Sequence, residues 1–479
     1  MSVPAPVVDL PQRRSLPRAA FVALRPRQWT KNLLLFAGII FAARIGDLSS
    51  WVEATMAFVA YCAASSASYL VNDVRDAPHD RLHPVKRARP IARGELSPRL
   101  AELLAALLIF GAVLLVAPLG LASILFLCTF FALQAAYTLA APAAPRKLNQ
   151  NESPFDAPDS LKEAVLAAVR AAPWNRYPPF APTELLERLA ARHGWVADGV
   201  LVGNGSNELI QATLSVTVGA GTPVVTPVPT FSLYRLLAAV YGGRHVPVPL
   251  TPDFEFDVDA LARAACHARA RAVVVNSPNN PTGTPFPDGA VERLLAETEA
   301  LVVMDEAYQD FGGPTAIPLL PDHPRLVVLR TFSKAMSLAG LRFGYALAHP
   351  AVAAEIAKAK LPYNVNRVTL AAAHAALDAA ELLAERTRQV QQSRDLLYRL
   401  LARVPGLRAF PSAANFVLIR CEARPAADVF ARLVSEHGIL VRDVSGAPGL
   451  EECLRITAGT EDDVEAVGRA LDAIFQGRT

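Results

Sequence analysis

The chain has 479 residues, more than one hydrophobic core ordinarily organises, so its length predicts two or three structural units. Apolar residues make up 52% and charged residues 19%, with a mean hydropathy of +0.27, which is high for a soluble protein and low for a purely membrane protein. Two unlike parts are therefore expected. The net charge of +3 argues for no particular partner, nucleic acid included, and five scattered cysteines without metal-site spacing indicate a reduced, cytosol-facing protein.

The first third of the chain is predicted to be an all-α transmembrane region, residues 31–141, after a leader at 1–30 that is expected to be disordered. The leader contains prolines and arginines but lacks the apolar core of a cleavable signal peptide. Of the four apolar runs that follow, the last two are long enough to cross a hydrocarbon layer of ~30 Å. A soluble helical bundle is the alternative, but these two runs show no polar stripe. The four runs are Leu33–Ala43, Trp51–Val71, Leu100–Pro118 and Leu119–Ala141.

The distribution of basic residues predicts how these helices are oriented. Arginines and lysines gather before the first run, between the second and third, and again at Arg146 and Lys147, whereas the other connections hold almost none beyond Arg44. Because cytoplasmic loops carry an excess of such residues, both ends and the middle loop are expected in the cytoplasm. The prediction is a multi-pass membrane protein whose remaining chain lies on the cytoplasmic side.

The middle loop carries the only chemistry of this part. Asp73, Asp76 and Asp80 fall on neighbouring turns of a predicted helix and could hold Mg²⁺ against a pyrophosphate, with the alternative of a solvated, charged loop. The string "NDVRDAPHDRLHPVKRARPIARG", preceded by "RPRQWTKN", resembles the UbiA-type prenyltransferase superfamily, nearest to its decaprenyl-phosphate phosphoribosyltransferase branch, over about residues 24–138.

That resemblance is to only part of such a protein. Members of the superfamily have about nine helices and a second Asp-rich loop, whereas this chain has four apolar runs and changes character at Pro142. The resemblance therefore implies a truncated region that serves as an anchor or is a remnant of a gene fusion, and that needs Mg²⁺ only if it is active. A linker is expected at 142–152, where prolines and basic residues separate the two parts.

From Ser160 onward the sequence predicts an α/β fold with a mostly parallel sheet, because amphipathic helical segments alternate with short buried strands. A large domain is expected at 153–365 and a small α+β domain at 366–479. Ligands of such sheets bind at the carboxyl ends of the strands. The predicted strands are Thr222–Thr226, Ala272–Asn276, Leu301–Asp305, Leu326–Arg330 and Tyr345–Ala348.

Polar residues follow these strands in an order that suits pyridoxal 5′-phosphate (PLP). Lys334 supplies an amine that condenses with the cofactor aldehyde, and Asp305 a carboxylate for the pyridine nitrogen. Tyr308 and Asn280 supply a phenol and an amide for the 3-oxygen of the ring. The remaining candidates hold the phosphate at a helix N-terminus or stack on the ring, with chance matches in an unrelated α/β domain as the alternative. They are Gly205, Ser206, Asn207, Ser333 and Arg342 for the phosphate and Phe231 for the ring.

These strings, from "KLNQNESPF" at Lys147 to the C-terminus, resemble fold-type I PLP enzymes of the class-II aminotransferase branch, and within it the histidinol-phosphate aminotransferases. The resemblance implies that Lys334 forms the Schiff base, that Asp305 is the pyridinium partner and that Thr331 joins the phosphate ligands. Tyr177 matches a tyrosine that reaches the neighbouring subunit's cofactor, so a homodimer is implied. The N-terminal arm usual in this family is replaced here by the membrane-like helices.

Substrate choice is predicted to depend on Arg455, which matches the arginine that binds substrate carboxylate, and on Arg442, which resembles a second arginine for a phosphate monoester. Asn415 is assigned to the same substrate group. The expected reaction joins histidinol phosphate and 2-oxoglutarate to imidazole acetol phosphate and glutamate, in histidine biosynthesis. An aromatic aminotransferase or a phosphothreonine decarboxylase would use the same cofactor residues. A membrane prenyl or phosphoribosyl transferase is the alternative from another class, and an unproductive fusion is the third.

Overall fold

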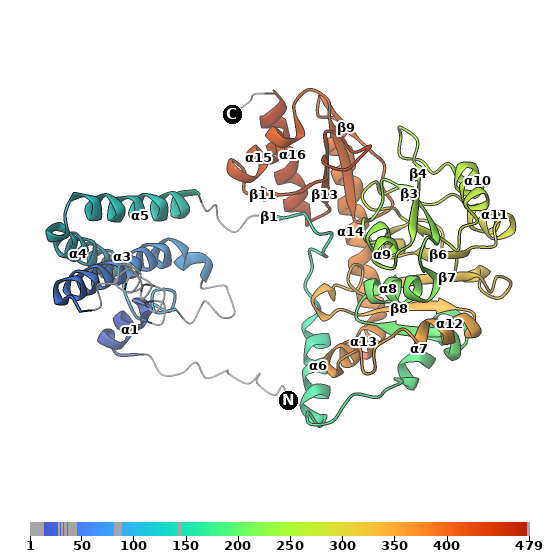
Figure 1. The fold of residues 1–479 in the computed structure, drawn as a ribbon, viewed down its shortest axis with the longest axis horizontal. Coiled ribbons are helices and arrows are strands. Elements are labelled where there is room, and N and C mark those ends of the chain that lie inside the picture. Colours follow the sequence, from blue (N-terminus) through green and yellow to red (C-terminus); the bar gives the residue numbers. More distant parts are fainter. Residues whose placement is uncertain are drawn as a thin grey trace, which may run out of the picture. The chain divides into compact units, whose positions relative to one another are not determined.

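The computed structural model describes residues 14–26, 29, 32, 36, 46–80, 89–140 and 146–476. The chain separates into two compact units, Met1–Ala144 and Pro145–Thr479, each with its own internal contacts (Figure 1). The division falls where the sequence changes from apolar helices to an α/β pattern.

The first unit consists of helices joined by turns, such as the turn at residues 89–97, in the part of it that the structure describes. Small side chains from two helices, among them Ala67, Ala101 and Ala105, are buried together, so the helices approach closely. Two stretches, Leu48–Val74 and Pro98–Leu119, are long and apolar enough to span a membrane. The predicted run Leu33–Ala43 lies outside the described residues apart from Phe36. The helices are α1 (Leu16–Ala23), α3 (Leu48–Asp80), α4 (Pro98–Val116) and α5 (Leu121–Ala140), with a 3-10 turn at Ala117–Leu119.

The second unit is built on a seven-stranded sheet in the order β2-β8-β7-β6-β5-β3-β4. The four strands β7, β6, β5 and β3 and the edge strand β4 run parallel, while β8 is antiparallel to both β7 and β2. The mostly parallel sheet and all five predicted strands are thereby confirmed. The strands are β2 (Val200–Gly203), β3 (Pro223–Val228), β4 (Arg244–Pro249), β5 (Ala272–Asn276), β6 (Leu301–Asp305), β7 (Leu326–Thr331) and β8 (Gly344–Ala348).

Helices cover both faces of this sheet because alternate strand residues point to opposite sides. Val273 and Val275 join a core that contains Leu185 and Leu294, while Val274 belongs to a second core on the other face. The first face is covered by α6 (Asp159–Ala171), α7 (Thr183–His193), α10 (Val258–Ala268), α11 (Ala290–Glu297) and α13 (Arg367–Asp378), and the second by α8 (Ser206–Thr217), α9 (Leu233–Val240) and α12 (Pro350–Ala357).

A smaller four-stranded antiparallel sheet, in the order β12-β13-β10-β9, forms the C-terminal part with its own core. The first residues of the unit join this part: Arg146 and Lys147 form β1, which pairs in parallel with β11, and Leu148 is buried in its core. Residues 146–152, which the sequence placed in a linker, are thus packed structure. The remaining elements are α14 (Ala380–Leu401), β9 (Leu407–Ala409), β10 (Phe416–Cys421), α15 (Ala426–Ser435), β11 (Ile439–Leu440), β12 (Arg442–Asp443), β13 (Cys453–Thr457) and α16 (Glu461–Gln476).

Candidate active site at the carboxyl edge of the large sheet

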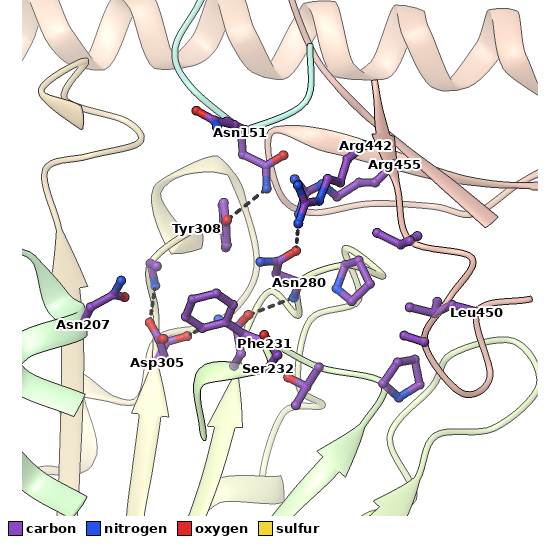
Figure 2. A pocket seen from close by; sticks show the side chains of 18 of the residues that line it. Asn151, Asn207, Phe231, Ser232, Asn280, Asp305, Tyr308, Arg442, Leu450 and Arg455 are labelled. Carbon is purple, nitrogen blue, oxygen red and sulfur yellow. Dashed lines mark hydrogen bonds between the residues drawn. The ribbon is translucent and has the colours of Figure 1, made fainter. Parts of the chain in front are cut away.

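A cavity of about 1230 Å³ opens where β3, β5, β6 and β7 end. Its other walls come from the loop after β12 and from residues 149–152, which belong to the segment that enters the unit (Figure 2). Most of the residues predicted from the sequence line it: Ser206, Asn207, Phe231, Asn280, Asp305, Tyr308, Thr331, Ser333, Lys334, Arg342, Arg442 and Arg455. Residues up to 249 positions apart in the sequence, from Ser206 to Arg455, are therefore brought to one place.

Asp305 is the last residue of β6 and is only 3% exposed. Its carboxylate accepts a hydrogen bond from the Tyr234 hydroxyl at 2.7 Å and one from the Ala307 N–H at 3.2 Å. Burial raises the pKa of Asp305 to about 6, although both hydrogen bonds act to lower it. The carboxyl group is consequently poised to become fully ionised when a positive charge comes close.

Lys334 follows β7, and its amine donates to the main-chain oxygen of Gln150 at 3.0 Å. Its Nζ lies 5.8 Å from the centre of the Tyr308 ring. Burial, followed by the positive charge of Arg455, lowers the pKa of Lys334 to about 8. A larger fraction of the amine is therefore neutral, and hence nucleophilic, near neutral pH than for an exposed lysine.

Tyr308 and Asn280 lie on the same side of the cavity. The Tyr308 ring packs edge-to-face against Phe416, and its hydroxyl oxygen accepts from Asn151 Nδ2 at 3.0 Å. Asn280 N–H donates to the side chain of Asn276 at 2.8 Å, and the Asn280 side-chain oxygen accepts from Arg455. Both polar groups are thus held in fixed positions.

An anion-binding corner is formed where α8 begins. Ser206 and Asn207 are its first residues, and the positive end of a helix dipole favours an anion there. Arg342 Nη1 donates to Ser333 Oγ at 3.2 Å, and a Cβ built on Gly205 would lie 2.5 Å from Arg342 Nη2. Glycine at position 205, where φ is +80°, is what lets the guanidinium rest on this turn.

Two guanidinium groups stand together on the opposite, C-terminal part. Arg442 and Arg455 are cross-strand partners in β12 and β13, and Figure 2 shows their side chains close together near Asn280. Arg455 is 8% exposed and also donates to the Asn149 main-chain oxygen at 2.8 Å. Burial and the charge of Arg442 lower the pKa of Arg455. Among the described residues no carboxylate pairs with either arginine, so the two charges are available to a bound anion.

Two predicted residues lie away from the cavity lining. Asn415 is completely buried, and its amide donates to the Asn151 main-chain oxygen at 3.1 Å, so it supports the cavity wall and does not contact the space where a substrate would bind. Tyr177 is 77% exposed and stacks on Tyr363 with ring centres 4.5 Å apart. Within one chain, therefore, Tyr177 belongs to the outer surface.

The predicted metal residues are described only in part. Asp73 is buried on α3 and pairs with Arg25 and Arg89, which neutralise it. Asp76 and Asp80 belong to the last turns of α3, but their side chains lie outside the described residues. Among the side chains that the structure does describe, no three acidic, histidine or cysteine groups come close enough to hold a metal ion. The Mg²⁺ site stays a prediction.

The structure adds residues that the sequence did not single out. Tyr234 and Asn276 both hold Asp305 in position. The Tyr234 hydroxyl donates to the Asp305 carboxylate, and Asn276 Nδ2 donates to the Asp305 main-chain oxygen at 2.8 Å. Asn151 reaches Tyr308 from a segment 157 residues away. The string "NQNES" carries the family resemblance, but its residues alone do not indicate which of its polar side chains points inward.

Comparisons with known proteins follow the same division. Residues 146–474 match the family described as aminotransferase class I and II, and residues 33–149 match the UbiA prenyltransferase family. A histidinol-phosphate aminotransferase of Chlorobium phaeovibrioides is 41% identical over 332 residues, which are 69% of this chain and 91% of that protein. The chain therefore belongs to the class I and II aminotransferases, which confirms the predicted PLP-dependent transaminase.

Solved structures agree with this assignment. The crystal structure of histidinol-phosphate aminotransferase from Sinorhizobium meliloti in complex with pyridoxal-5′-phosphate has a TM-score of 0.65 and 30% identity, covering 72% of this chain and 94% of its own. L-threonine-O-3-phosphate decarboxylase from Porphyromonas gingivalis has a TM-score of 0.61 at 22% identity, covering 69% and 99%. That second likeness shows the fold alone.

Proposed function

We propose that this chain transfers the amino group of histidinol phosphate to 2-oxoglutarate, giving imidazole acetol phosphate and glutamate. The observation that carries the proposal is the pair Arg442 and Arg455 in the cavity that also holds Lys334. Two guanidinium groups side by side suit a phosphate dianion, whereas one is sufficient for a carboxylate. The similar proteins described above, which match most of this unit, are histidinol-phosphate aminotransferases, and this likeness supports the same substrate.

The cavity residues fit PLP as the cofactor. The corner at Ser206, Asn207, Ser333 and Arg342 provides the donors that a phosphate requires, and Gly205 keeps it open because a side chain there would collide with Arg342. Asp305 would face the pyridine nitrogen, Phe231 the ring face, and Tyr308 with Asn280 the 3-oxygen. Thr331 supports the corner by accepting the Ser333 N–H at 3.1 Å.

Bound PLP supplies an aldehyde that combines with amines and a ring that withdraws electrons from the substrate Cα. Asp305 would stay ionised beside a protonated ring nitrogen, since the opposite charge offsets the effect of burial. Lys334, with its pKa lowered to about 8, would first hold the cofactor and then carry the proton from the substrate Cα. Arg455 and Arg442 would orient the substrate through its phosphate, or glutamate through its carboxylates.

The test is an absorbance titration of the purified full chain, loaded with PLP in detergent, with histidinol phosphate and separately with phenylalanine. Histidinol phosphate is expected to change the cofactor spectrum at much lower concentration, and Lys334→Ala is expected to lose the covalently bound cofactor. If phenylalanine acts equally well, the phosphate proposal fails in favour of an aromatic substrate. Release of CO₂ from O-phosphothreonine, without transfer to a keto acid, would replace transamination with decarboxylation.

The proposal extends to assembly and location. We infer a homodimer, because Tyr177, Phe180 and Trp174 are large aromatic side chains exposed on one stretch of the catalytic unit.

We infer a multi-pass membrane protein with this unit in the cytoplasm, supported by the two apolar helices, the UbiA match and the basic residues near the helix ends. Light scattering of the detergent-solubilised protein tests the homodimer, and protease accessibility in sealed inverted vesicles tests the cytoplasmic location of the catalytic unit.

A further inference from the structure

Three consecutive residues of the entering segment each provide a hydrogen-bond partner to a different group of the site. The main-chain oxygen of Asn149 accepts from Arg455, and that of Gln150 accepts from Lys334. Asn151 differs from these two because it acts through its side chain, whose Nδ2 donates to the Tyr308 hydroxyl oxygen at 3.0 Å. Its identity, and not only its backbone, therefore matters to the site.

The orientation of the Asn151 amide is determined by its surroundings. The residue is 1% exposed and has a φ of 54°, a conformation that asparagine tolerates better than most residues. Thr457 Oγ1 accepts the Asn151 N–H at 3.0 Å and donates its own proton to Asn151 Oδ1 at 3.1 Å. Because Thr457 donates its proton to the oxygen of the amide, this arrangement favours the orientation in which the NH₂ group faces Tyr308.

This orientation of the amide determines the direction in which the Tyr308 hydroxyl donates its hydrogen bond. A phenol has one O–H to donate, and Asn151 offers its oxygen a donor but no acceptor. Among the described residues no other group accepts from the Tyr308 hydroxyl, which lines the cavity. The Tyr308 proton is thus directed into the cavity.

We propose that Asn151 is a positioning residue for Tyr308, which compels the phenol to donate its hydrogen bond to the 3-oxygen of the bound cofactor. The inference rests on the proposed role of Tyr308 in PLP binding. An O–H donor at the 3-oxygen favours negative charge on it, so the arrangement stabilises the deprotonated state of the bound cofactor.

The groups around Tyr308 have opposing effects on its pKa. Burial raises the pKa of Tyr308, and Asp305 raises it further, while Arg455 and the hydrogen bond from Asn151 lower it. Lys334 faces the ring. Asn151→Gly changes none of these charged groups, so its effect reports on the loss of the amide.

The experiment is a pH titration of the absorbance of the PLP-loaded full chain in detergent. Two variants are used: Asn151→Gly, which removes the amide and tolerates the positive φ, and Asn151→Asp, which keeps the shape but offers Tyr308 an acceptor. Both are expected to raise the midpoint pH of the cofactor's spectral change, by about 0.5 pH unit or more for the loss of one hydrogen bond. Tyr308→Phe should raise it at least as much.

The decisive comparison is the double variant. With Tyr308→Phe already present, Asn151→Gly should shift the midpoint no further, because the residue through which it acts is gone. Thr457→Val, which frees the amide to turn, should reproduce part of the shift, and it replaces the Asn151 variants if these fail to fold. Ser153→Ala, on the same segment, should leave the midpoint where it is because its hydroxyl contacts Ser337 and does not line the cavity.

The inference is overturned if Asn151→Gly and Asn151→Asp titrate as the unchanged protein does while Tyr308→Phe is shifted, or if the two changes add fully. That result would leave the proposed reaction untouched, since the response of the unchanged protein to histidinol phosphate tests it separately. If Tyr308→Phe itself produces no shift, the role of Tyr308 and the inference built on it both fail.

Discussion

At the scale of the single residue, Asp305 is the group whose ionisation depends most on what fills the cavity. Its pKa in the folded protein is about 6, above the ordinary value of 3.8. The stability that protonated Asp305 contributes is therefore present below pH 4 and is lost as the pH rises through 6. A difference of about two pKa units corresponds to about 3 kcal/mol of folding stability lost in the cofactor-free protein by pH 8.

Asp305→Asn is accordingly expected to stabilise the cofactor-free protein at pH 8 and to change little at pH 4. Hydrogen exchange of the main-chain amides of β6 is the suitable measurement, because it reports on this strand separately from the helical unit. The same variant should bind PLP more weakly, since the ring nitrogen loses its counter-charge. Equal protection of β6 in both proteins at every pH would contradict the assignment of the raised pKa.

Arg442 illustrates a second residue-scale effect, the recognition of charge. Arg442→Ala is expected to raise KM for histidinol phosphate roughly 10- to 100-fold, because a charge-assisted hydrogen bond contributes about 1.5–3 kcal/mol. Transamination of phenylalanine should change by less than about threefold, since one arginine is sufficient for a carboxylate. Steady-state kinetics with both substrates measure the difference. Arg420→Ala, on β10 of the same sheet, is the matched control. An equal loss for both substrates in Arg442→Ala would refute a phosphate clamp.

At the scale of the element, the turn that leads from β2 into α8 has to lie against the start of β8. Gly344 is the first residue of β8, and a Cβ built there would meet the backbone of Gly205 and Ser206 closer than any real contact. Gly344→Ala is expected to push away the turn that carries the anion corner and to weaken PLP binding at least tenfold, measured by titrating the cofactor-free protein. Gly340→Ala, where a Cβ meets nothing within 4 Å, should bind PLP normally. Unchanged affinity in Gly344→Ala would show that the corner tolerates the displacement.

The strands also show how much of the fold could be predicted from the sequence. The buried strands β5, β6 and β7 consist of apolar residues and end in polar ones, so their catalytic candidates could be predicted, and so could their bounds to within one residue at the end of β7. β4 could not, because Arg244–Pro249 contains two prolines and a charged residue, a composition that only an edge strand accepts. β1 is two residues long and exists only through its pairing with β11.

The site follows the same rule. Lys334, Asp305 and Tyr308 stand next to recognisable strands, whereas Asn151, Tyr234 and Thr457 act through contacts between distant segments. Asn415, predicted as a substrate residue, is buried, and its side chain supports Asn151. Position along the chain predicts which segments meet; the direction in which a side chain points depends on the packing around it.

At the scale of the whole molecule, the hydrophobic cores of the catalytic unit are formed by residues of that unit alone. The clusters on both faces of the large sheet and in the C-terminal part are made only of residues between 148 and 474. The first unit has a different surface: the outer side of α4 exposes Leu103, Leu107 and Phe110, which suits contact with lipid and not with water.

These two properties predict that the units can be separated. A chain that begins at Pro145 is expected to be soluble without detergent and to bind PLP with unchanged affinity, while the full chain sediments with membranes. Phe110→Arg in the full chain, at a side chain that is 64% exposed, should reduce membrane association because an arginine at the centre of a membrane helix costs about 2.5–3.5 kcal/mol. Phe286→Ala, in the core of the catalytic unit, should leave that association unchanged although it weakens the fold. A full chain that stays in the soluble fraction would refute the membrane assignment, and a separated unit that aggregates would show that the helices complete its fold.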